Sequence, residues 1–238
     1  PIFNQYLLFM GNLARGDLGI SMASGQPLTK LLYEKMPPTI ELALVAMVIS
    51  TVVGVGAGII SATTRSKSVD YASRTFAILG LSIPWFWIAI LFIYLFSVKL
   101  RWTPVGGRIG VGIQYEIITN FLIVDSLITA NWTALVSALR HLTLPALAIG
   151  LTSAGFVARM TRSAMLEVMR ADYIRSARAK GLHDYTVNMG HALRNAILPV
   201  ITLQGLQFGT LLGGAVITEL VFAWPGLGRM LLDGILRR

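Results

Sequence analysis

Long runs of residues without any charged side chain constrain this chain more than any other feature. Four such runs occupy residues 42–64, 75–98, 142–158 and 195–218. A helix needs roughly 17 to 25 mainly apolar residues to cross a hydrocarbon core of about 30 Å, because each residue adds about 1.5 Å. The pattern therefore predicts an all-α, polytopic membrane protein with spans at about residues 38–64, 75–98, 141–160 and 195–219. Pro84 lies inside the second span and should kink it.

The composition supports a membrane setting. Hydrophobic residues make up 55% of the chain and charged residues only 13%, so lipid has to cover much of the apolar surface. The formal net charge of +9 would suggest nucleic acid in a soluble protein, but basic residues of membrane proteins hold loops on the cytoplasmic side. We therefore expect membrane lipid as a partner, and no nucleic acid.

Lysine and arginine cluster in two of the connections. Residues 65–74 carry three basic residues and residues 159–194 carry seven. Together they hold half of the 20 lysines and arginines in the chain. The positive-inside rule places these connections in the cytoplasm. We expect a single membrane domain over residues 1–238, with external segments at 1–37, 99–140 and 220–238 and a cytoplasmic segment at 161–194. The chain starts without methionine and stops after a helical pattern, and we expect both ends to be incomplete.

The loop at residues 99–140 contains two shorter apolar runs, at 117–124 and 126–139, separated by Asp125. Each run is too short to span a bilayer. We interpret the segment as an external loop with an interfacial helix. The alternative is a fifth span over residues 117–139 with one buried aspartate, which would reverse the sides of everything after it.

No sequence pattern points to an enzyme, a cofactor or a metal site. The chain has no cysteine, no P-loop, no H-E-x-x-H and no G-x-S-x-G, so we expect no catalytic, cofactor-binding or metal-binding residue, and a partner would have to bind any ATP. The span interiors contain no ionisable residue, which argues against a proton-driven carrier but not against an ATP-independent channel. Glu41 and Glu219 lie at the outer ends of spans, where each could line a vestibule or sit in the headgroup region.

Glycines recur at every fourth position in two spans. The fourth span has Gly205, Gly209 and Gly213, and the first has Gly54 and Gly58. Such faces let helices pack backbone to backbone. A smooth wall for a moving substrate is the alternative role.

Small residues and cations alternate in the basic segment that follows the third span. Gly181 is placed to end one helix before a second begins near Asp184, which predicts a short helical hairpin across the membrane face. Small side chains let another protein approach closely, and the cations could pair with an acidic rim on it. An ordinary basic loop obeying the positive-inside rule would show the same composition.

Four stretches, in order along the chain, resemble the signatures of one family. They are GDLGIS at residues 16–21, DYIRSARAKGL at 172–182, HALRNAILPVIT at 191–202 and VFAWPGLGRMLLD at 221–233. Together they are similar to the permease subunits of ATP-binding-cassette importers, in the peptide and nickel branch typified by the first dipeptide or oligopeptide permease. Residues 175–177 stand where the general motif has E-A-A, and the leucine-proline pair at 198–199 comes later than usual. Both departures are normal for the peptide branch.

The resemblance implies a fold, a set of partners and a substrate class. The fold is that of a type I importer permease with six spans, of which this chain would hold the central four. The partners are a second homologous permease, two cytoplasmic ATPase subunits and an external substrate-binding protein, in a bacterial plasma membrane. The substrates are di- or oligopeptides, while nickel, glutathione and oligosaccharide importers share the scaffold.

The resemblance also implies two sets of functional residues. The first set corresponds to the short helix, at about residues 173–184, that seats on the ATPase: Asp172, Tyr173, Arg175, Ala177, Arg178, Ala179, Lys180, Gly181 and Leu182. The second set, Trp224, Pro225 and Gly226, would form part of the surface on which the binding protein lands.

Overall fold

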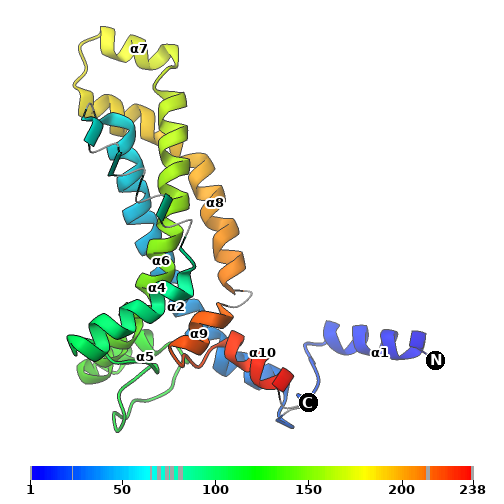
Figure 1. The fold of residues 1–238 in the computed structure, drawn as a ribbon. Coiled ribbons are helices and arrows are strands. Elements are labelled where there is room, and N and C mark those ends of the chain that lie inside the picture. The colour runs from blue at the N-terminus through cyan, green and yellow to red at the C-terminus, as the bar shows by residue number, and fades with distance from the viewer. Residues whose placement is uncertain are drawn as a thin grey trace.

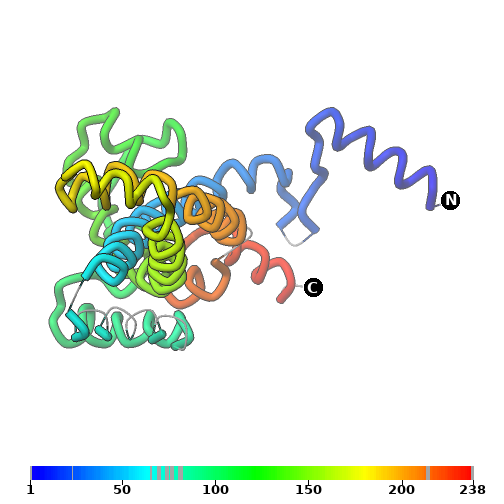
Figure 2. The backbone as a smooth tube through the Cα atoms, turned by 90° about the horizontal axis from the view of Figure 1, so that it is seen from above, coloured from blue at the N-terminus to red at the C-terminus, as the bar shows by residue number. Residues whose placement is uncertain are grey.

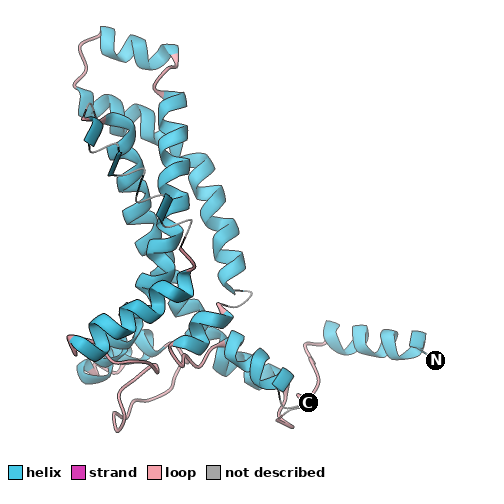
Figure 3. Ribbon diagram, viewed as in Figure 1, coloured by secondary structure: helices cyan, strands magenta, loops and turns pink. Residues whose placement is uncertain are grey.

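The chain folds into an elongated helical bundle with shorter helices at both ends (Figure 1). The computed structural model describes residues 2–22, 24–64, 66–68, 71–72, 75, 78–79, 83–212 and 215–236. Within these residues the regular elements are helices (Figure 3), apart from one bridge between Ile20 and Pro27. The bundle consists mainly of α2 (Leu28–Thr63), α6 (Trp132–Val168) and α8 (Arg194–Leu212). The predicted all-α class is confirmed.

Three predicted spans overlap helices that are long and apolar enough to cross a membrane. These helices are Leu28–Thr63, Trp132–Val168 and Thr186–Leu212. The first two contain 36 and 37 residues, about 54 Å of helix each, so they extend well beyond a hydrocarbon core. The helix of the fourth span stops at Leu212, and α9 (Val216–Val221) follows after residues 213–214, which lie outside the described part.

The second predicted span is described only in part. α4 (Trp85–Phe92) begins directly after Pro84 and continues as the π-helix η1 (Ile93–Lys99). Pro84 has an extended backbone, with φ −59° and ψ 128°, so a helix starts there rather than bending through it. Residues 76–77 and 80–82 of this span lie outside the described residues.

The stretch at 117–139 contains two helices rather than one. α5 (Leu122–Ile128) is followed by Ala130 at φ +52°, and α6 begins at Trp132. The side chain of Asn131 accepts a hydrogen bond from the Ala134 amide at 3.1 Å, which caps the new helix. The alternative of a single fifth span at 117–139 is therefore wrong, and residues 132–140 of the expected loop belong to α6.

Small residues bring α2 and α6 into direct contact. A Cβ atom on Gly54 would lie only 2.6 Å from the Cβ of Val157, and one on Gly58 only 2.5 Å from the Cβ of Thr161. Four residues further along α2, from Gly54 to Gly58, the contact also moves four residues further along α6, from Val157 to Thr161. The two helices therefore run in the same direction. The predicted packing role of Gly54 and Gly58 is confirmed.

The other helices gather at the two ends of the bundle. α7 (Asp172–Ala179) lies across one end, and η2 (Thr186–Leu193) leads from it into α8 (Figure 1). α5, α9 and α10 (Leu227–Leu236) lie at the other end (Figure 1). α1 (Ile2–Ala14) extends away from the bundle (Figure 2). We call the two ends of the bundle the α7 end and the α10 end.

We expect Gly58→Ala to destabilise the protein by about 1–3 kcal/mol, because the added methyl group overlaps Thr161 and the Ala158 carbonyl. Gly56 lies on the same helix with open space around it. Gly56→Ala is therefore the matched control and should leave stability unchanged or slightly higher, since alanine is the better helix former. Thermal unfolding of the purified protein in detergent measures both, and an unchanged Tm for Gly58→Ala would contradict the close packing.

Candidate functional site

A short helix and a turn cover the α7 end of the bundle. We call residues 172–182 the α7 turn. α7 ends where Gly181 adopts φ +76°, a conformation that costs glycine little. The Gly181 amide donates to the Arg178 carbonyl at 3.0 Å, and the Leu182 amide to the Ala177 carbonyl at 3.4 Å, bonds that close a helix C-terminus. The next helix begins at Asp184, so the predicted hairpin is confirmed.

The inner face of α7 packs on the bundle through two apolar residues. Ile174 is 0% exposed and Ala177 7%, and both join a cluster that includes Met165 of α6 and Val187 of η2. Ala177 was expected to contact a partner protein. It instead packs against its own chain, because it lies one helical turn after Ile174 and so on the same inward face of α7. Sequence reasoning missed Ile174, although the three-residue spacing of Ile174 and Ala177 in a polar helix was an available signal.

A hydrogen bond adds a second attachment of the α7 turn. The Nδ2 atom of Asn195 on α8 donates to the hydroxyl of Tyr173 at 3.0 Å. The α7 turn therefore contacts α6 and η2 through its apolar face and α8 through Tyr173. A displacement of this turn has to move the helices to which it is attached.

The outer face of the α7 turn is small and cationic. An ion pair of 3.7 Å between Arg175 and Asp172 lies in solvent and contributes little to stability. Ser176 and Ala179 are also exposed on this face, so only small side chains separate the cations there. Among the described residues no three side chains of His, Cys, Asp or Glu could hold a metal ion. The predicted residues exposed here are Asp172, Tyr173, Arg175, Arg178, Ala179, Lys180, Gly181 and Leu182.

Residues 222–229, which we call the C-terminal turn, lie at the α10 end. Trp224 is 1% exposed, and its Nε1 atom donates to the Pro38 carbonyl at 2.9 Å. A side chain on Gly226 would overlap the Glu219 carboxylate. The expectation that Trp224, Pro225 and Gly226 form a landing surface is corrected for Trp224 and Gly226, which are buried. Only Pro225 is partly exposed.

A fully buried carboxylate holds the C-terminal turn against α2. The Oε1 atom of Glu219 accepts a hydrogen bond from the Thr39 hydroxyl at 2.7 Å, and its Oε2 atom accepts one from the Arg229 amide at 3.0 Å. The Thr39 oxygen in turn accepts from the Leu227 amide at 2.9 Å. Buried carboxylates require such partners. Glu219 is therefore part of the interior, and neither the vestibule nor the headgroup alternative describes it.

A second buried carboxylate fixes the loop before α5. Arg108 Nη2 lies 2.7 Å from Oε2 of Glu41 and 2.6 Å from the Asn120 carbonyl oxygen. The Oε1 atom of Glu41 accepts from the Ile123 amide at 2.9 Å. The side chains of Arg108 and Glu41 are only 10% and 7% exposed, so this pair joins the loop and α5 to α2. Glu41, like Glu219, lies in the interior.

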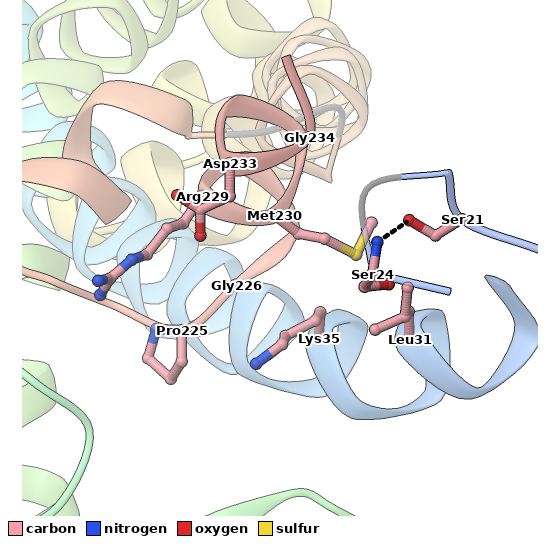
Figure 4. A pocket seen from close by; sticks show the side chains of 10 residues that line it. All are labelled: Ser21, Ser24, Leu31, Lys35, Pro225, Gly226, Arg229, Met230, Asp233 and Gly234. Carbon is pink, nitrogen blue, oxygen red and sulfur yellow. Dashed lines mark hydrogen bonds between the residues drawn. The ribbon is translucent and has the colours of Figure 1, made fainter. Parts of the chain in front are cut away.

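A hollow lies beside the C-terminal turn, between the start of α2 and α10 (Figure 4). It contains two half-buried cations, Lys35 and Arg229, and one carboxylate, Asp233. No ion pair forms at Lys35 within the described part of the chain. The lining residues are Ser21, Ser24, Leu31, Lys35, Pro225, Gly226, Arg229, Met230, Asp233 and Gly234.

One face of α8 stays open. A Cβ atom on Gly205 or Gly209 would meet nothing within 4 Å. Leu198 and Leu206 of the same helix are 65% and 67% exposed. Gly213 lies outside the described residues. Gly205 and Gly209 therefore do not pack closely against another described helix of the chain, and the packing role of these glycines stays a prediction.

The chain is similar to known transport proteins. The family model described as "binding-protein-dependent transport system inner membrane component" matches residues 54–238. A di/tripeptide transport system permease protein of Pseudomonas aeruginosa (strain UCBPP-PA14) is 46% identical over 100% of this chain and 71% of its own length. A dipeptide transport system permease protein of Escherichia coli (strain K12) is 42% identical with the same coverage. An inward-facing structure of the MetNI methionine ABC transporter has a similar fold, with a TM-score of 0.60 and 19% identity over 84% of this chain and 77% of its own.

We expect Thr39→Val to loosen the C-terminal turn, because it leaves one oxygen of the buried Glu219 and the Leu227 amide without their partner. An unsatisfied buried group costs about 1–3 kcal/mol. Thr39→Ser retains the hydroxyl and should recover most of this loss. Limited proteolysis of the detergent-solubilised protein, with cleavage mapped within residues 222–236, measures the difference. Equal cleavage of Thr39→Val and wild type would show that the hydroxyl does not hold the turn.

Proposed function

Because the chain belongs to the family of binding-protein-dependent transport system inner membrane components, we propose that it forms part of the pore of an ATP-driven importer of di- and oligopeptides. The chain is a multi-pass inner-membrane permease subunit. The exposed cationic face of the α7 turn, attached to the bundle by Ile174 and Tyr173, is the observation that carries the proposal. Nickel, glutathione or an oligosaccharide is the alternative substrate class on the same scaffold, and an ATP-independent channel is a more distant alternative.

The α7 turn is the proposed seat of an ATPase subunit. The chain contains no nucleotide-binding motif, so two separate cytoplasmic ATPases would supply hydrolysis. When they close on ATP, a turn fastened to α6, η2 and α8 would transmit their movement to the spans as a rigid element. The cluster of arginines and lysines near this end supports placing it in the cytoplasm.

The open face of α8 is the proposed contact with a second, homologous permease. Glycines at four-residue spacing let helix backbones approach closely in lipid, where no hydrophobic force drives helices together. Gly205 and Gly209 have this spacing and no neighbour within the chain. A pore between the two permeases would then be lined partly by α8.

The hollow at the α10 end is the proposed landing point of an external substrate-binding protein. The C-terminal turn forms a firm base there, because Glu219 and Thr39 hold it from below. Lys35 and Arg229 present positive charge at the surface of this base (Figure 4). An acidic side chain on the binding protein would find two cations there and one carboxylate, Asp233.

We expect Ala179→Trp to lower binding-protein-stimulated ATP hydrolysis about tenfold, the effect of about 1.4 kcal/mol lost from docking. Ala179 is exposed on the outer face of the α7 turn, so the large side chain blocks an approaching partner without disturbing the bundle. Ser163→Trp, at an exposed position of α6, is the control. Hydrolysis is measured in the complete reconstituted complex, with Tm as a check on folding. Full stimulation in Ala179→Trp would overturn the coupling assignment.

We expect Lys35→Glu to weaken binding of the external protein about tenfold in low salt, and less so at high ionic strength, where charge interactions are screened. Lys30→Glu is the matched control, because Lys30 lies on the same helix but is 61% exposed and pairs with Glu34. Binding to the complex in lipid nanodiscs gives the Kd values. Identical losses for Lys30→Glu and Lys35→Glu would point to general charge attraction rather than to the hollow.

A further inference from the structure

α1 is an amphipathic helix with no charged residue. In a helical projection of residues 2–14, one broad side carries Ile2, Phe3, Tyr6, Phe9, Met10 and Leu13. The opposite side carries neutral polar or small residues, namely Asn4, Gln5, Gly11 and Asn12, with Leu8 among them. A surface helix of a soluble protein would bury the apolar side. None of the residues of α1 is buried, and Phe9 remains 57% exposed.

The end of α1 and its link to α2 are ordered by hydrogen bonds. The Asp17 amide donates to the Asn12 carbonyl at 2.9 Å and Gly16 adopts φ +79°, which terminates the helix. The Leu28 amide donates to the Gly19 carbonyl at 2.9 Å where α2 begins. These bonds fix the described residues at the two ends of the connection that presents the exposed apolar side of α1.

The position of α1 matches the boundary of a membrane. It runs across the direction of the bundle at the level of the α10 end and extends away from the bundle (Figures 1 and 2). On α2, exposed apolar residues extend from Tyr33 to Ile60, about 40 Å of helix, which matches a hydrocarbon core together with its headgroup regions. α1 joins the chain before Leu28, beyond the outer end of this band.

Exposed aromatic residues mark the same boundary. Trp102 and Trp132 are each 66% exposed, and Tyr33 in the first turns of α2 is 59% exposed. Trp132 begins α6 and Trp102 follows η1, so both lie where apolar helices start or end. Tryptophan and tyrosine concentrate at membrane–water interfaces, where an apolar ring and a polar group are both satisfied.

We propose that α1 lies flat in the interface of the lipid bilayer at the α10 end, with its apolar side among the upper acyl chains and its neutral polar side toward water. The bilayer is present at this level because the chain is an inner-membrane protein whose apolar band on α2 ends there. Interfacial helices with one apolar side bind in this way. The absence of charge on α1 makes its binding independent of anionic lipid.

Single-cysteine labelling tests this placement, because the chain contains no cysteine. Phe9→Cys on the apolar side, Asn12→Cys on the polar side and Val111→Cys in a fully exposed loop are each labelled with an environment-sensitive fluorophore. The full-length protein is studied in nanodiscs of neutral lipid. We expect lipids brominated near the headgroup to quench the label at position 9 at least threefold more than the label at position 12, and aqueous iodide to quench most strongly at position 111.

Two results would overturn the proposal. Iodide quenching at position 9 equal to that at position 111 would place α1 in water. A label at position 9 that is shielded from both iodide and brominated lipid would place the apolar side against another protein chain, such as a second permease. Each result leaves the ATPase and binding-protein assignments untouched.

Discussion

The close contact between α2 and α6 is the constraint on which the rest of the structure depends. Lipid tails are as apolar as leucine, so the hydrophobic effect does not drive spanning helices together, and their association depends on close packing. Gly54 and Gly58 of α2, and Gly150 of α6 opposite Ile49, remove the side chains that would keep the two backbones apart. α8 packs against both helices of this parallel pair, and α4 and α5 pack against α6.

The two ends of the pair are built by different interactions. At the α10 end, Glu41 and Glu219 are buried and use their oxygens to fix a loop and the C-terminal turn to α2. At the α7 end, the attachment is mainly apolar, through Ile174 and Ala177, with one hydrogen bond to Asn195. A hydrogen-bonded carboxylate resists displacement, which suits a fixed landing surface. A small helix attached to several spans at once suits a part that has to move with a partner.

Local patterns predicted local structure well. Uncharged runs predicted the long helices because spanning length is set by bilayer thickness, and Gly181 predicted a helix end because few other residues adopt its backbone conformation. Contacts between distant parts of the chain were not predictable in this way. Thr39 and Glu219 are 180 residues apart, and nothing near either residue indicates the other. For the same reason Trp224 looked like a surface aromatic until the structure placed its indole against Pro38.

By itself the sequence determined that this protein is helical, that it lies in a membrane, and which short segment carries the cations of the α7 turn, because hydropathy, charge and glycine spacing act within one helix or one turn. The tertiary structure decided which side of each element is available. It turned Ala177 inward and Ala179 outward, buried Trp224 and Gly226, and left α1 and one face of α8 open. These outcomes depend on which neighbour fills the space around a residue, and that neighbour comes from elsewhere in the chain.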